Sequence, residues 1–294
     1  MLEPVQFLFN DNINIYLQSV GNPSLDVLFK AITTIGSEPS YILLASLIFW
    51  CFGKKTGIRA MYVILFSAFA AIFAKNLFAM PRPPEYLHKI QENDFGFPSG
   101  HAFVSSGFWG YLGGMIKNYW LISVGAVAIL SISLSRIYLG VHYLGDVVGG
   151  IIFGLLMALI SLKAEPGITS RLEKLGRIPG YFVALMLPVI LVAIAIMQHN
   201  ILIEQEEVGL VMAGIGAGYL LEEERVGFAD ATNNRQRIKR AVMGIVVLGI
   251  IYLISSVLLS INPNFIFFKY AALGFASTFI APWVITKIEF KNQK

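Results

Sequence analysis

The sequence has few charged residues and almost no cysteine. Only 14% of its 294 residues are charged, whereas soluble globular domains contain about a quarter. Together with a hydrophobic content of 56%, this shortage excludes an ordinary soluble domain. The single cysteine, Cys51, excludes an internal disulfide framework. The first residues, Met1 to Pro4, also lack the basic start of a cleaved signal peptide, so none is expected.

The hydrophobic residues form runs that are long enough to cross a lipid bilayer. Residues 180–198 and 241–262 contain no charge at all, and a transmembrane helix needs about 20 residues. We therefore expect an all-α, polytopic membrane helix bundle. The predicted spans are 40–53, 57–79, 100–116, 119–137, 142–163, 180–198, 208–222, 241–260 and 265–286. The more polar residues 1–39 predict an amphipathic segment on the membrane or on the helix ends, with a tilted extra span as the alternative.

Lysine and arginine fall mainly on one side of these predicted spans. Sixteen of the 22 basic residues lie in one set of connections, and short cytoplasmic loops carry such an excess. The asymmetry predicts a cytoplasmic C-terminus and an N-terminal segment outside. The net charge of +4 then reflects orientation in the membrane, and no nucleic-acid partner is expected.

A charged stretch at residues 164–179 divides the chain. It contains Pro166 and Pro179 and predicts a cytoplasmic linker. The linker is expected to separate a core at residues 1–163, which is rich in polar signals, from a plainer C-terminal membrane domain at residues 180–294.

Two cations lie at the predicted outer end of the second span. Lys75 and Arg82 are seven residues apart, which is two turns of helix, so they would project from one face. Snorkelling of each head group to the interface is the structural alternative. It suits Arg82 better than Lys75, which follows a long apolar run where a cation usually has a function.

The third span opens with Pro98, Ser99, Gly100 and His101. Serine is a good N-cap, and a helix start offers unpaired N–H groups and a positive dipole end. This combination favours an anion site. Ordinary capping beside an interfacial His101 is the alternative.

A third cluster consists of Arg136, His142 and Asp146. If helical, His142 and Asp146 stack at i and i+4, so the carboxylate could accept the Nδ1 proton and leave Nε2 free to attack. The Arg136 fork suits phosphate oxygens. A buried structural His–Asp pair with a snorkelling arginine is the alternative. All three clusters map to the same predicted outer face, where a lipid head group would lie.

These motifs resemble the three-part signature of the type 2 phosphatidic acid phosphatase family, which includes lipid phosphate, undecaprenyl diphosphate and sphingosine-phosphate phosphatases. The resemblance covers roughly residues 20–163. It implies a core of the phosphatidic acid phosphatase type, to which this chain adds about four C-terminal transmembrane helices. It also implies that His142 forms a phosphohistidine, that Asp146 orients it, and that His101 protonates the leaving alkoxide and then activates water. The implied phosphate-binding residues are Lys75, Arg82, Ser99, Gly100 and Arg136.

The resulting expectation is a metal-independent phosphatase of a lipid phosphate monoester, with no cofactor, acting at the outer face. Its expected partners are the phosphorylated lipid and the membrane lipids. An isoprenyl diphosphate phosphatase, a phosphotransferase, and a transporter or scramblase that only binds phosphate are the alternatives. The polar loop residues Glu85, His88, Glu92 and Asp94 are expected to lie in a solvated loop, with contact to a lipid head group as the alternative.

Overall fold

The computed structural model describes residues 7–175, 182, 186–190, 193 and 203–291. Within them every regular element is helical, so the predicted all-α class is confirmed. The chain forms two compact units: residues 1–42 with 63–166, and residues 43–62 with 167–294. The boundaries between the units therefore fall inside the helices α4, α5 and α8.

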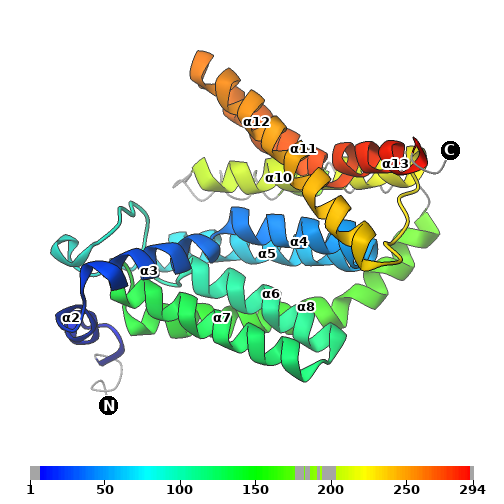
Figure 1. Cartoon of the computed structure of the whole chain (residues 1–294). Helices are drawn as coiled ribbons and strands as arrows, with labels where there is room; N and C mark the ends of the chain where they lie inside the picture. The colour runs from blue at the N-terminus through cyan, green and yellow to red at the C-terminus, as the bar shows by residue number, and fades with distance from the viewer. Residues whose placement is uncertain (1–6, 176–181, 183–185, 191–192, 194–202, 292–294) are drawn as a thin grey trace. The chain divides into compact units, whose positions relative to one another are not determined.

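In the part of the chain that the structure describes, seven α-helices contribute to the first unit. They are α2 (Asn12–Ser19), α3 (Pro23–Ile35), α4 (Glu38–Cys51), α5 (Lys54–Phe78), α6 (Gly100–Ile116), α7 (Tyr119–Tyr138) and α8 (Leu144–Leu175). Helix α6 packs on α7, and α2 and α3 also pack on α7 (Figure 1). The segment expected on the helix ends thus forms two helices that pack on the bundle.

Glycines allow α6 and α8 to approach each other closely. A Cβ on Gly154 of α8 would lie 2.2 Å from the carbonyl oxygen of Phe103, and one on Gly150 would lie 2.6 Å from that of Ser99. Only a residue without a side chain fits at such distances. A Cβ on Gly107 of α6 would lie 2.4 Å from the Ser67 hydroxyl of α5. The glycine-rich third span therefore packs tightly, as small residues do in membrane bundles.

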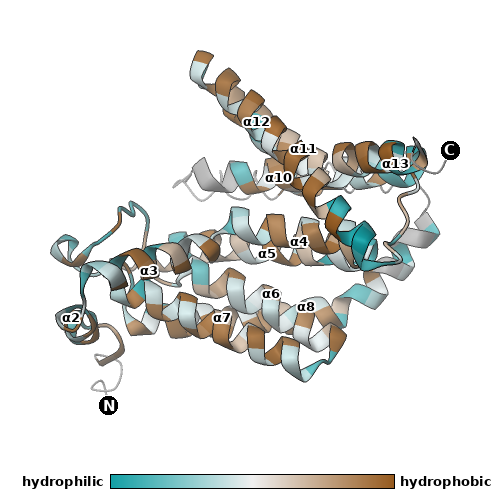
Figure 2. Ribbon diagram, viewed as in Figure 1, coloured by the Kyte–Doolittle hydropathy of each residue, from teal (hydrophilic) through white to brown (hydrophobic). Residues whose placement is uncertain are grey.

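Fewer helices qualify as membrane spans than the nine predicted. By length and composition, five helical stretches among the described residues could cross a bilayer: 54–78, 119–138, 144–168, 234–261 and 265–290. Helices α3 and α4, bent by 55°, could form a sixth. Figure 2 shows the hydrophobic residues along these stretches. Helix α6 is only 17 residues long, and α10 carries six acidic residues and one arginine, so neither predicted span is among the five.

The second unit contains α10 (Ile203–Arg225), α11 (Asn234–Ile261), α12 (Phe265–Phe275), the π-turn η2 (Ala276–Ile280) and α13 (Ala281–Lys291). Helix α10 packs on α12, where a Cβ on Gly214 would lie 2.2 Å from the Ala271 carbonyl oxygen. The Trp50 indole donates to the Ser277 carbonyl at 2.8 Å. Lys54 and Glu222 pair at 3.0 Å. These contacts hold residues 43–62 in the second unit.

The prediction of a loop at residues 164–179 is wrong for residues 164–175, because α8 continues as a helix to Leu175. Pro166 lies inside that helix, although an internal proline removes one backbone hydrogen bond and usually kinks or ends a helix. Most of the predicted span 180–198 lies outside the described residues.

Candidate active site

The predicted site residues lie at or beside four neighbouring helix ends of the first unit. Lys75 lies in the last turn of α5 and Arg136 in the last turn of α7. His101 lies in the first turn of α6, and Asp146 in the first turn of α8. Because these helix ends adjoin, residues far apart in the sequence meet. Five of the predicted site residues are buried: Lys75, Ser99, Arg136, His142 and Asp146.

His142 and Asp146 contact each other as the sequence predicts. Nδ1 of His142 lies 3.3 Å from Oδ2 of Asp146, which also accepts the Tyr143 N–H at 2.8 Å. His142 itself lies just before α8 rather than on it. The carboxylate therefore bridges the connection and the first helical turn, and it holds the ring in place.

Arg82 determines the protonation of the other imidazole nitrogen. Its Nη1 lies 3.1 Å from Nε2 of His142, and a guanidinium can only donate. Nε2 is therefore the acceptor, and the ring proton is on Nδ1, facing Asp146. Burial above all, and then the charges of Arg82 and Arg136, lowers the pKa of His142 well below its ordinary value. The imidazole is thus neutral, with its nucleophilic lone pair on Nε2.

The Arg82 side chain is tied to the backbone on two sides. Nη1 also donates to the Val141 carbonyl at 2.6 Å, and Nε donates to the Asp94 carbonyl at 2.8 Å. Snorkelling to the interface does not describe this side chain. Its fork joins the loop after α5 to the connection before α8.

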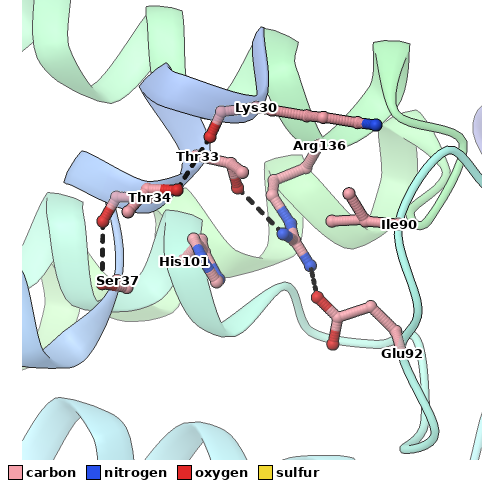
Figure 3. Close-up of a pocket in the computed structure, with 8 residues that line it drawn as sticks. All are labelled: Lys30, Thr33, Thr34, Ser37, Ile90, Glu92, His101 and Arg136. Carbon is pink, nitrogen blue, oxygen red and sulfur yellow. Dashed lines mark hydrogen bonds and ion pairs between the residues drawn. The ribbon is translucent and has the colours of Figure 1, made fainter. Parts of the chain in front are cut away.

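Arg136 lies between α3 and the loop that follows α5. Its Nη1 donates to the Thr33 hydroxyl at 2.9 Å, and its Nη2 pairs with Glu92 (Figure 3). Thr33 and His101 line the same pocket. One turn of α3 therefore orients a cation of the site and lies in the same pocket as His101.

The start of α6 provides donors beside Lys75. A Cβ on Gly100 would lie 4.0 Å from the Lys75 Nζ. Ser99 occupies the N-cap position, but its hydroxyl makes no capping bond. The Ser99 hydroxyl is buried, and among the described residues this hydroxyl has no hydrogen-bond partner. Ordinary capping is therefore wrong for Ser99, and its hydroxyl is available to a ligand.

Glu92 and Asp94 correct the expectation of a solvated loop. Asp94 forms ion pairs with Lys75 and Arg82, and Glu92 forms one with Arg136. Burial favours a raised pKa for Asp94, but Lys75 and Arg82 outweigh it and lower this pKa. The remaining two loop residues differ: Glu85 is exposed, and the His88 ring lies 2.9 Å from the Pro83 carbonyl oxygen.

Sequence reasoning missed the supporting residues of α2 and α3. Asn14 is buried and donates to the carbonyls of Ile137 at 2.8 Å and His142 at 3.0 Å. It holds the backbone of the His142 connection, as Thr33 holds Arg136. The only sequence signal was the mixture of polar and apolar residues in the segment 1–39.

A pocket of about 360 Å³ opens beside these residues. It is lined by Lys30, Thr33, Thr34, Ser37, Ile90, Glu92, His101 and Arg136 (Figure 3). Three cations, two histidines and a helix start can bind an oxyanion and attack it. Over the described part of the chain, no three His, Cys, Asp or Glu residues are grouped so as to hold a metal ion.

Two family models match the chain. Residues 56–169 match the PAP2 superfamily, and residues 207–293 match the transmembrane extension of PAP2 superfamily phosphatases. The second match identifies the predicted extra C-terminal helices as an extension found in this superfamily.

Several curated proteins are similar to part of the chain. A probable sphingosine-1-phosphate phosphatase from Dictyostelium discoideum is 28% identical over 48% of this chain and 38% of its own length. A dihydrosphingosine 1-phosphate phosphatase from Schizosaccharomyces pombe is 31% identical over the same shares. An undecaprenyl-diphosphatase from Sulfolobus acidocaldarius is 30% identical over 38% of this chain and 56% of its own length. The chain thus spans less than two thirds of each of these relatives.

Two solved structures are also similar. A PAP2 type phosphatidylglycerolphosphate phosphatase from Bacillus subtilis has a TM-score of 0.48 at 20% identity, covering 57% of this chain and 98% of its own. Aquifex aeolicus LpxE has a TM-score of 0.46 at 24% identity, covering 53% and 96%. The family models and the curated relatives confirm the resemblance seen in the motifs: this chain belongs to the PAP2 superfamily and carries its transmembrane extension.

Proposed function

We propose that this protein is an integral membrane phosphatase that hydrolyses a lipid phosphate monoester through a phosphohistidine, without a metal ion. One observation carries the proposal: a buried, neutral His142 has its Nδ1 on Asp146 and its Nε2 beside Arg82. Binding an anion needs cations, whereas a His–Asp pair with this orientation is what nucleophilic catalysis needs. This difference favours an enzyme over a transporter or scramblase.

The first step transfers the phosphoryl group to the protein. Nε2 of His142 attacks phosphorus as the bond to the lipid oxygen breaks. His101, which the negative charge of the bound phosphate group would keep protonated, gives its proton to that oxygen. Asp146 stabilises the imidazolium that forms. In the second step, His101 takes a proton from water, which attacks phosphorus and breaks the P–N bond. Inorganic phosphate leaves, and His142 is neutral again.

Positioned positive groups lower the barrier of both steps, because the phosphoryl transition state is loose and anionic. Lys75, Arg82 and Arg136 would hold the oxygens, together with the Ser99 hydroxyl and the Gly100 amide. Three cations and a helix start suffice to neutralise a phosphate group, and for this reason the proposal needs no metal.

The names of the relatives support a phosphorylated lipid as substrate. Two are named for sphingosine phosphates and one for undecaprenyl diphosphate. An isoprenyl diphosphate phosphatase is therefore the second candidate. We further propose that residues 1–163 form the phosphatase core and residues 180–294 a C-terminal membrane domain, with the site on the extracytoplasmic face and the C-terminus in the cytoplasm.

Phosphate release by purified protein tests the function. With chelator present, wild-type protein should release phosphate from phosphatidic acid, a sphingoid phosphate or a prenyl diphosphate, and the preferred substrate identifies the class. His142→Ala should lower turnover by at least about 1,000-fold, because the attacking atom is gone. His88→Ala, a matched change in the neighbouring loop, should stay near wild type. Dependence on an added divalent ion, or an active His142→Ala, would contradict the mechanism.

A further inference from the structure

Two carboxylates of the loop between α5 and α6 hold all three cations of the candidate site. Asp94 pairs with Lys75 and Arg82. Glu92 pairs with Arg136 and lies 3.4 Å from Nη2 of Arg82. The groups that the proposed function assigns to the phosphate are therefore already bound to acidic side chains of the same chain.

The two carboxylates resemble a phosphate group in charge and in donor preference. Together they carry two negative charges, and a phosphate monoester carries about 1.5 to 2 at pH 7. Carboxylate and phosphate oxygens also accept the same paired bonds from a guanidinium fork. Glu92 and Asp94 thus hold Lys75, Arg82 and Arg136 much as a phosphate would.

Binding a phosphate group beside these two carboxylates would cost free energy. The Lys75 ammonium and the Arg82 Nη2 already point at acidic oxygens, and like charges crowded into one buried site disfavour each other's ionised forms. An incoming phosphate must therefore displace at least one carboxylate. Glu92 is suited to leave, since it is 24% exposed and lines both the pocket of Arg136 and a second pocket formed by residues 85–93.

Resting on the proposed function, we propose that Glu92 and Asp94 compete with the phosphate group for its binding cations and so promote release of inorganic phosphate. The competition weakens the binding of every oxyanion by a similar factor. A lipid phosphate is still bound through contacts of its tail, whereas free inorganic phosphate has no tail and depends on the cations alone. The carboxylates therefore keep the affinity for the free ion low, so that the product leaves.

Direct binding of inorganic phosphate to the full-length protein in detergent tests the proposal. The variants are Asp94→Asn and Glu92→Gln, which keep side-chain shape and remove one charge each. Calorimetry should show inorganic phosphate binding about tenfold more tightly to each variant, the effect of removing one competing charged hydrogen bond. Glu85→Gln, the same change at an exposed position of the same loop, should bind as wild type does.

Tighter binding in either variant supports the proposal for that carboxylate, and unchanged or weaker binding in both overturns it. Asp94 is the more buried of the two, so size-exclusion chromatography checks that its variant is folded. If it is not, the more exposed Glu92→Gln decides the question alone.

Calorimetry needs no turnover, which separates this inference from the proposed function. If the variants bind phosphate more tightly but wild-type protein hydrolyses no lipid phosphate, the proposed function fails and the competition stands. If wild-type protein is an active phosphatase but both variants bind phosphate no more tightly, only the competition fails.

Discussion

His142 receives its chemical state from neighbours on both sides. Arg82 can only donate to Nε2, and Asp146 accepts from Nδ1. Burial then lowers the pKa of the ring and so disfavours a second proton. Lysine at position 82 would supply the same charge but neither the planar fork nor the simultaneous bonds to Val141 and Asp94.

Histidine NMR on protein labelled with ¹⁵N at this residue type tests the tautomer. The pKa of His142 is lowered, so the neutral form persists as the pH falls, and the ring should stay uncharged at pH 6.5. The ¹⁵N chemical shifts of the His142 ring should show that Nδ1 carries a proton and Nε2 does not. The signal should vanish in His142→Ala, with four histidines in all to assign. A doubly protonated ring at that pH, or a proton on Nε2, would contradict the geometry.

The cations and the His–Asp pair could be predicted from the sequence because charge is costly in an apolar run and their spacing is short. Glu92 and Thr33 gave no such signal. Each belongs to a residue type that is ordinary in loops or helix ends, and their partner Arg136 lies 44 and 103 positions away. Only the fold brings them together, so the sequence favoured solvent for Glu92.

At the scale of elements, the close approach of α6 and α8 positions the site. Their glycines place the Ser99 end of one helix against the Asp146 end of the other, and the Ser99 N–H donates to the Asp146 carbonyl at 2.9 Å. The glycine content of the third span is typical of close helix packing. The predicted bounds of this span, 100–116, are those of α6, whereas the bend between α3 and α4 depends on where helices end, which apolar runs alone do not determine.

Gly154→Ala should separate these two helices. The new methyl group would meet the Phe103 carbonyl at 2.2 Å, and overpacking of this kind costs about 1–3 kcal/mol. We expect a lower midpoint of heat denaturation in detergent together with lower activity. Gly167→Ala, on the same helix but with nothing within 4 Å, should be neutral or slightly stabilising, as alanine favours helix. Equal effects of the two changes would show that the contact is unimportant.

At the scale of the whole molecule, the distribution of basic residues predicts the orientation in the membrane. The site lies in the first unit, at the helix ends near the loop that holds Glu92. If basic connections face the cytoplasm, this loop faces outside. The substrate would then be met in the outer leaflet.

Labelling of single cysteines in intact cells tests the orientation. Cys51 is buried and is first replaced by serine. A cysteine at the exposed Asn93 should react with an impermeant maleimide, and one at the exposed Arg235 should react only after the membrane is opened. The reverse pattern would invert the topology.

The helices α4 and α5 also limit how this chain could be divided or recombined. Residues 43–62 precede most of the PAP2 match at residues 56–169, yet they pack with residues after 167. A Cβ on Gly244 would lie 2.3 Å from the Trp50 ring, and Lys54 pairs with Glu222. A chain shortened to residues 1–166 would leave these apolar and charged surfaces without their partners. The C-terminal extension therefore cannot be removed without exposing residues 43–62. Grafting the extension onto another family member would require exchanging residues 43–62 as well.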